Sequence, residues 1–249
     1  SGDYRGPVTL TEGLSQSLNT VAVRLGLEVG PKTVAATAQR LGIRSKLDAN
    51  ASIALGTSAV TPLELVSAYA SFANGGLSVE PYVITEVITR NGDLLYTRPD
   101  RVPHQVIDPG ILASFNVMMR ETLKSGTAKR ADLPGWDAAG KTGTSQDFRD
   151  AWFIGYTGAL VTGVWLGNDD NSPTKHVAGG SLPVEIWSRF MKQSLAKTKP
   201  FILPASDLPQ SDLFSVLGRA LFGTQSQNPS GTQKGPLILQ PQTDSAQPN

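Results

Sequence analysis

The sequence contains no cysteine, which excludes disulfide bonds, thiolate metal ligands and a cysteine nucleophile. It has only two histidines, His104 and His176, and they lie too far apart in the sequence to suggest a metal pair. Positive and negative charges are nearly balanced, since 22 basic and 21 acidic residues give a formal net charge of +1. Nucleic-acid partners usually need a basic face, so we expect no nucleic-acid partner.

Long hydrophobic runs are also missing. The stretch Ala151–Gly167 is uncharged, but four glycines interrupt it. We expect two short strands joined at Thr157-Gly158 here, rather than a membrane helix. Nothing at the start of the chain resembles a signal peptide or a membrane anchor. Because the chain starts at Ser1 without an initiator methionine, we interpret it as part of a longer protein.

The rest of the composition suits one large domain followed by a tail. Hydrophobic periodicity and capping signals predict helices over residues 9–27, 31–41, 61–74, 109–123 and 182–195. Strands are expected over 82–90 and 94–97, around an Asn-Gly-Asp turn, and within the glycine-rich region 135–170. Residues 199–249 are rich in Pro, Gln, Ser and Gly, so we expect a mostly disordered tail with a short amphipathic helix over 212–222.

The most specific motif is Lys141–Ser145, which reads Lys-Thr-Gly-Thr-Ser. Side chains alternate along a strand, so Lys141 would place a cation on the same face as Gly143, whose missing side chain leaves room for a substrate peptide. Thr142 and Thr144 offer hydroxyls to a carboxylate, and a strand N–H can donate to an oxyanion. This five-residue string is expected by chance roughly 0.0006 times in such a chain, so we treat it as functional.

A phosphate-binding loop is a remote alternative, because Gly135 to Thr142 also fits the pattern Gly-x-x-x-x-Gly-Lys-Thr. That site needs a buried strand before it and a helix that opens at the Lys-Thr. Residues 129–134 do not read as a strand, and Gly143 and the residues after it do not read as a helix start. The context therefore disfavours nucleotide binding.

Two further motifs complete the signature of one class of serine acyl-transfer enzymes, Ser-x-Asn and Ser-x-x-Lys. Ser17-Leu18-Asn19 supplies the first. Residues 114–116 and 226–228 match it too, but Ser17 and Asn19 are favoured by their position at a helix start well upstream of Lys141.

Ser-x-x-Lys, which carries the nucleophile, occurs at Ser172 and Ser194, and both follow Lys141 in the chain. Ser172 lies in a predicted loop, and Ser194 lies at a helix end where the dipole disfavours an alkoxide. We therefore expect the nucleophilic serine to lie upstream of Ser1.

With these motifs, the chain resembles the transpeptidase domain of class A penicillin-binding proteins, the bifunctional peptidoglycan synthases, from about Tyr4 to about Met191. The remaining strings that carry the resemblance are Gly6–Leu10, Ser17–Leu25, Ala54–Gly56, Val60–Leu65, Ala73–Gly76, Arg149–Tyr156 and Val164–Asp169. The stretch Asp150–Phe153 favours class A over the monofunctional class B.

The resemblance implies an α/β fold of the α+β type, in which helices flank an antiparallel sheet. Residues 1–198 would form the C-terminal part of this domain, without its N-terminal part, and residues 199–249 would form the tail. The missing part includes two sheet strands, so we expect an uncovered apolar surface and an edge that is displaced or paired.

The resemblance also implies a serine-type D,D-transpeptidase, which cross-links peptidoglycan stem peptides through an acyl-enzyme and is acylated by β-lactams. Ser17 would lie in the proton-transfer network, Asn19 would bind the substrate's peptide, and Lys141 would supply positive potential. The substrate-binding segment would comprise Thr142, Gly143, Thr144 and Ser145, with the Thr144 N–H in the oxyanion hole. No metal or organic cofactor is implied.

The parent protein would be anchored upstream in the bacterial inner membrane, carry a glycosyltransferase domain and act on the periplasmic side. This chain alone would then be inactive. A non-catalytic module of the same fold, which senses peptidoglycan or β-lactams, remains an alternative. A serine β-lactamase is disfavoured by the helical region between Asn19 and Lys141 and by the strings typical of class A.

Overall fold

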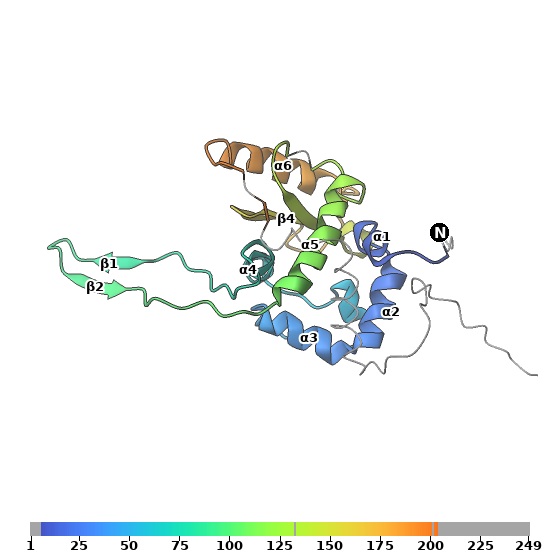
Figure 1. The fold of residues 1–249 in the computed structure, drawn as a ribbon, viewed down its shortest axis with the longest axis horizontal. Helices are drawn as coiled ribbons and strands as arrows, with labels where there is room; N and C mark the ends of the chain where they lie inside the picture. The colour runs from blue at the N-terminus through green and yellow to red at the C-terminus, as the bar shows by residue number, and fades with distance from the viewer. Residues whose placement is uncertain (1–5, 132, 201, 204–249) are drawn as a thin grey trace, which may run out of the picture.

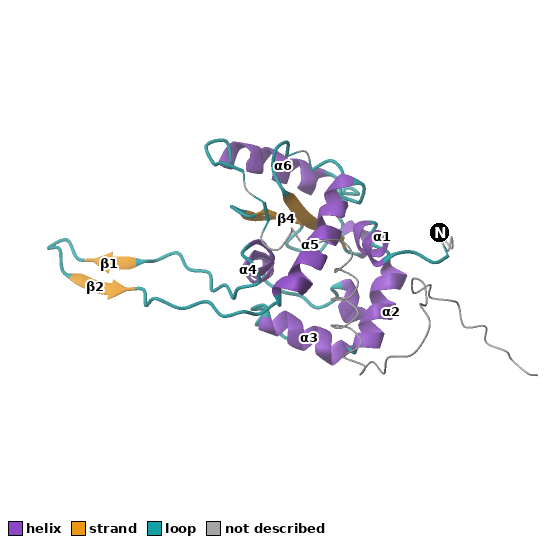
Figure 2. Ribbon diagram, viewed as in Figure 1, coloured by secondary structure: helices purple, strands orange, loops and turns teal. Residues whose placement is uncertain are grey.

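The computed structural model describes residues 6–131, 133–200 and 202–203. It shows a three-stranded antiparallel sheet between helices and a separate hairpin (Figures 1 and 2). The α-helices are α1 (Leu10–Ser15), α2 (Asn19–Val29), α3 (Pro31–Arg40), α4 (Pro62–Ala73), α5 (Pro109–Lys124) and α6 (Leu182–Ser194). The strands are β1 (Glu86–Ile88), β2 (Leu94–Thr97), β3 (Ala138–Thr144), β4 (Asp150–Thr157) and β5 (Val161–Gly167).

The sheet has the order β3-β4-β5, so β3 is an edge strand among the described residues. Lys141 pairs with Ile154, and Gly143 pairs with Trp152. Partners in an antiparallel pair point to the same face, so these four residues share one face of the sheet. The expected strands in the region 135–170, and the connection after Thr157, are confirmed.

Apolar side chains cover both faces of the sheet. On one face, Phe153 meets Trp187 of α6 edge to face, with ring centroids 5.2 Å apart. On the other face, Tyr156 packs with Met119 of α5 and with aromatic residues of α4. The Tyr156 hydroxyl donates to Asn116 Oδ1 at 2.7 Å, so the one polar atom of this buried ring is satisfied.

A single helix over residues 9–27 is a wrong prediction. The Thr9 side chain does accept from the Glu12 N–H at 3.1 Å and caps the start of α1. However, Ser17 has φ +55° and separates α1 from α2. Packing explains the break: a Cβ on Gly126 would lie 2.3 Å from the Ser15 carbonyl oxygen, so the loop after α5 approaches the backbone at this point.

The remaining helix predictions are confirmed to within one or two residues by α3, α4, α5 and α6. The hairpin is also confirmed, although β1 covers only part of the predicted strand 82–90 and its register shifts between Val87 and Ile88. It extends away from the helices and the sheet (Figure 1). The predicted helix over 212–222, and most of the tail, lie outside the described residues.

No helix in the described ranges combines the length and the apolar composition that crossing a membrane requires.

Glu64 fixes the start of α4 to the preceding loop. Its carboxylate accepts hydrogen bonds from the Ser45 hydroxyl at 2.6 Å and from the Ser45, Arg44 and Thr61 N–H groups. The Thr61 hydroxyl also donates to it, and Thr61 and Glu64 together form a capping box. These donors, the Ser45 hydroxyl first, lower the pKa of Glu64 from 4.5 to about 2.

We expect Glu64→Gln to lower the unfolding temperature at pH 7, because an amide cannot accept all of these hydrogen bonds. Because the pKa of Glu64 is lower in the folded state than in the unfolded state, the ionised carboxylate stabilises the fold fully above pH 4.5. This stabilisation is lost as the pH falls through about 2. The difference between wild type and variant should therefore shrink from pH 4.5 to pH 2 in thermal unfolding. Glu28→Gln, at an exposed helical position, is the control, and a pH-independent difference for Glu64→Gln would contradict the assignment.

Candidate functional site

Lys141 connects β3 to the break between α1 and α2. Its Nζ donates to Ser17 Oγ at 2.8 Å and to the Thr142 carbonyl oxygen at 3.0 Å. Burial lowers the pKa of Lys141 from 10.5 to about 8. An ammonium with this pKa can release and recover a proton near neutral pH, so the Lys141–Ser17 pair is suited to proton transfer.

Ser17 reaches Lys141 because the chain turns sharply between the two helices. With φ +55°, Ser17 adopts a left-handed conformation that serine seldom occupies. Asn19 then begins α2 and is exposed. A hollow of about 400 Å³ starts at Asn19 and runs along α2 past Val23 to Leu27. Asn19 therefore lies at one end of an open, largely apolar surface.

The other predicted site residues follow Lys141 along β3 and the turn after it. Thr142 and Thr144 point to the face opposite Lys141, because strand side chains alternate. Thr142 Oγ1 lies 2.6 Å from Thr127 Oγ1, and Thr144 Oγ1 accepts from the Gly179 N–H at 2.9 Å. Both hydroxyls thus already have partners within the chain.

Ser145 closes the β3–β4 turn instead of facing Lys141. Its N–H donates to the Asp150 carbonyl oxygen at 3.0 Å, and its Oγ accepts from the Asp150 N–H at 2.7 Å. The structure therefore brings Ser17 and Lys141 into contact and places Thr142, Gly143 and Thr144 beside them on one strand, whereas Ser145 has a structural role in the turn.

Two residues of this region were not predicted from the sequence. Thr127 follows α5, and Gly179 precedes α6. A Cβ on Gly179 would lie 2.3 Å from the Gly143 carbonyl oxygen and 2.4 Å from that of Trp152, so this loop lies directly against the sheet backbone. The pair Gly179-Gly180 was the only signal in the sequence, and it does not say which strand the loop approaches.

The alternatives left open by the motifs find no support in the geometry. Lys141 and Thr142 lie inside β3, so the strand–loop–helix arrangement of a phosphate-binding loop is absent at this position. Ser172 lies in the loop after β5, and Ser194 is the last residue of α6. Neither serine begins a helix with its lysine one turn later.

No group of three or more His, Cys, Asp or Glu side chains in the described part of the chain could hold a metal ion.

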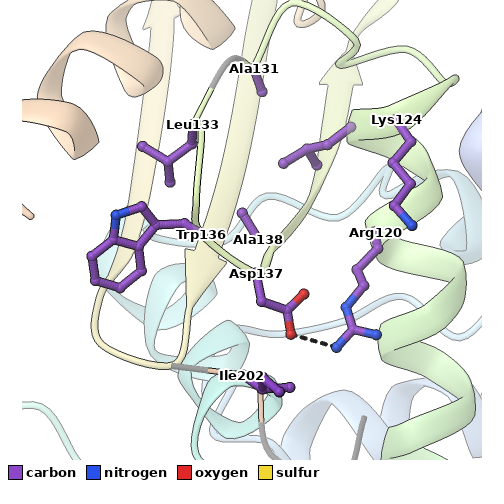
Figure 3. Close-up of a pocket in the computed structure, with 9 residues that line it drawn as sticks. Arg120, Lys124, Ala131, Leu133, Trp136, Asp137, Ala138 and Ile202 are labelled. Carbon is purple, nitrogen blue, oxygen red and sulfur yellow. Dashed lines mark hydrogen bonds and ion pairs between the residues drawn. The ribbon is translucent and has the colours of Figure 1, made fainter. Parts of the chain in front are cut away.

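A second cavity, of about 450 Å³, lies between α5 and the start of β3 (Figure 3). Two of its charged groups, Arg120 and Asp137, pair with each other. Arg120 Nη2 donates to Asp137 Oδ2 at 2.6 Å, and the Leu203 N–H donates to the same oxygen at 2.8 Å. We therefore assign the site to the Ser17–Lys141 region and not to this cavity.

Residues 2–192 match the family described as the penicillin binding protein transpeptidase domain. The chain is 39% identical over 188 residues to penicillin-binding protein 1A of Aquifex aeolicus, and this match covers 75% of this chain and 26% of that protein. It is 37% identical over 201 residues to penicillin-binding protein 1A of Neisseria meningitidis, with 78% and 25% covered. The chain thus spans about a quarter of the length of these relatives.

Solved structures of penicillin-binding proteins are also similar to this chain. The structure of PonA1 from Mycobacterium tuberculosis in complex with penicillin V has a TM-score of 0.74 and 29% identity, covering 82% of this chain and 60% of that one. Penicillin-binding protein 1A from Haemophilus influenzae has a TM-score of 0.73 and 28% identity, covering 84% of this chain and 37% of that one. The expected α+β fold, with an antiparallel sheet flanked by helices, is confirmed.

We expect Lys141→Met to raise the unfolding temperature at pH 7, because the folded state disfavours the buried ammonium. The folded pKa of about 8 lies below the ordinary value of 10.5, so the unfolded chain binds this proton more tightly. The wild-type protein therefore becomes more stable as the pH increases from about 8 to 10.5, because Lys141 loses its charge in the fold. The difference in unfolding temperature between Lys141→Met and wild type should disappear over that range. Thermal unfolding from pH 7 to 10.5 tests this, with Lys129→Met at an exposed position as the control; a wild type more stable than Lys141→Met at pH 7 would refute it.

We expect Gly179→Ala to destabilise the fold by about 1–3 kcal/mol, because the added methyl group meets two backbone carbonyl oxygens that cannot move independently of the sheet. Thr144→Val removes the hydrogen bond from Gly179 without adding bulk, so its effect should be smaller. Chemical denaturation of the three proteins measures both effects, and equal stability of Gly179→Ala and wild type would show that the loop is free to move.

Proposed function

Because the chain belongs to the penicillin-binding protein transpeptidase domain family, we propose that it forms the Lys-Thr-Gly side of the active site of a serine-type D,D-transpeptidase. The observation that carries this proposal is the 2.8 Å hydrogen bond from Lys141 Nζ to Ser17 Oγ. It joins two of the three signature motifs of serine acyl-transfer enzymes, which lie 124 residues apart in the sequence.

The reaction attaches the acyl part of one stem peptide to a serine and releases D-alanine. The serine oxygen attacks the carbonyl carbon of the D-Ala-D-Ala bond, and its proton passes through the lysine of the Ser-x-x-Lys motif to the Lys141–Ser17 pair. The C–N bond breaks, and the amine of the departing D-alanine takes up a proton from this pair. Ser17 Oγ donates that proton and is reprotonated by the Lys141 ammonium, to which it is hydrogen-bonded. An amine of a second stem peptide then takes the acyl group, which forms the cross-link and frees the serine.

The neighbouring residues bind the peptide around this proton pathway. Gly143 leaves the edge of β3 open to an extended peptide. The Thr144 N–H contributes to the oxyanion hole, Thr142 and Thr144 line the site of the terminal carboxylate, and Asn19 binds the peptide backbone of the substrate. A β-lactam presents a carboxylate and a strained amide to the same groups and acylates the same serine.

The nucleophilic serine, in a Ser-x-x-Lys motif, is supplied by a segment that precedes Ser1 in the intact protein. The open, largely apolar hollow beside Asn19 supports this, since it offers a surface on which such a segment can pack. The relatives support it as well, because the match covers only about a quarter of their length. Accordingly, we propose that residues 1–198 are one part of the domain, that 199–249 form a separate tail, and that the intact protein is a membrane-anchored, periplasmic peptidoglycan synthase.

The test is covalent labelling of the intact gene product with a fluorescent penicillin, followed by identification of the labelled peptide. We expect the label on a serine upstream of Ser1. In Ser17→Ala we expect acylation to slow by about 100-fold, because acid–base groups typically contribute at least this much.

Ser58→Ala, which removes a serine hydroxyl that accepts from the Asp48 N–H, serves as the matched control and should be labelled at the wild-type rate. Label on Ser172 or Ser194 would overturn the assignment of the nucleophile. A complete absence of label would instead favour a non-catalytic module of this fold.

A further inference from the structure

The corner after α5 is built around a tight backbone turn. The Ser125 and Gly126 N–H groups both donate to the Glu121 carbonyl oxygen at 3.0 Å, and the Ala128 N–H donates to that of Thr122 at 3.0 Å. These bonds satisfy the last carbonyl groups of the helix and turn the chain back on itself. Thr127 therefore projects from a corner that is anchored on both sides.

Thr127 contacts three segments that are distant in the sequence. Its N–H donates to the Ser15 carbonyl oxygen at 3.0 Å, and its Oγ1 lies 2.6 Å from Thr142 Oγ1. Its carbonyl oxygen faces Gly180, where a Cβ would lie only 2.4 Å away. One residue thus links the end of α1, the strand β3 and the loop before α6.

These links adjoin both members of the proton-transferring pair. Ser15 is two residues before Ser17, and Thr142 is next to Lys141 in β3. The Thr142 carbonyl oxygen also accepts from Lys141 Nζ, and this bond lies within β3, so a shift of the strand relative to the Ser17 turn changes the distance from Lys141 Nζ to Ser17. The distance between the Ser17 turn and β3 is therefore set in part by Thr127.

Neighbouring contacts leave the corner little freedom to move independently. Gln16 Nε2 donates to the Ser125 carbonyl oxygen at 3.2 Å, beside the Thr127–Ser15 bond. Gly126 lies so close to Ser15 that a Cβ would be 2.3 Å from its carbonyl oxygen. The corner and the Ser17 turn thus behave as one packed unit, and the Thr127 hydroxyl joins that unit to β3.

We propose that Thr127 is a positioning residue for acylation: its hydroxyl holds β3 against the Ser17 turn and so keeps Lys141 within hydrogen-bond distance of Ser17. This inference rests on the proposed function. Thr127 acts through its hydrogen bonds to Thr142, which is next to Lys141, and to Ser15, which is two residues before Ser17.

The substitution Thr127→Val isolates the hydroxyl, because valine has nearly the same shape and keeps the N–H bond to Ser15. Thr127→Ser keeps the hydroxyl and loses only a methyl group. Thr162→Val makes the same chemical change in β5, where the hydroxyl donates to Met191 Sδ and not to β3. These three variants separate the hydrogen bond from side-chain volume and from the general effect of losing a threonine hydroxyl.

The experiment measures acylation of the intact gene product by a fluorescent penicillin over a range of concentrations, together with the unfolding temperature of each variant. We expect Thr127→Val to lower the limiting acylation rate about tenfold, since small displacements of reacting groups have effects of this size or larger. The half-saturating penicillin concentration should stay the same. Thr127→Ser should return the rate to within about threefold of wild type, and Thr162→Val should leave it unchanged.

The outcomes distinguish this inference from the proposed function. If the wild-type protein is not acylated at all, the proposed function fails and the positioning role fails with it. If wild type and Thr127→Val are acylated at the same limiting rate, only the positioning role is overturned. The same holds if Thr127→Ser is as slow as Thr127→Val, or if only the half-saturating concentration changes, because the residue would then act through its shape or through the carboxylate site at Thr142.

Discussion

The constraint on which the candidate site depends is the backbone packing that brings Lys141 and Ser17 within hydrogen-bond distance. Their hydrogen bond connects a strand to a turn that lies 124 residues earlier, so it exists only when the helices and the sheet have packed together. The strand is fixed by its pairing with β4 and by α5, and the turn is fixed by the corner after α5. Backbone contacts thus fix the positions of both partners.

Two locally unfavourable features converge at this contact. Burial disfavours the charged form of Lys141, and Ser17 adopts a left-handed backbone conformation. Features of this kind persist only where the surrounding structure enforces them, and they cluster at functional sites. The surroundings that enforce them here are backbone-to-backbone approaches, at Gly126 to Ser15 and at Gly179 to β3.

The sequence was informative wherever a local pattern determines the structure. The strands within residues 135–170 were predicted because glycines alternate there with aromatic and β-branched residues, and α4 was predicted from Pro62 in its first turn and from Asn74-Gly75-Gly76 at its end. The break at Ser17 was not predicted, because the helical periodicity of residues 9–27 continues through it. It is imposed by the corner at Gly126, about 110 residues later. The contact of Thr127 with Thr142 was equally invisible, because it depends on how α5 lies against β3.

The hairpin of β1 and β2 gives the molecule a second, separate cooperative unit. Within the described residues its strands pair only with each other, and it extends away from the helices and the sheet (Figure 1). Exposed Val83, Leu95 and Val102 contribute little hydrophobic stabilisation to it. Local opening of the hairpin therefore has a free energy well below that of global unfolding, and its amide hydrogens exchange with solvent on a faster timescale than those of β4. Motion of this hairpin consequently leaves the geometry of the sheet β3-β4-β5 unchanged.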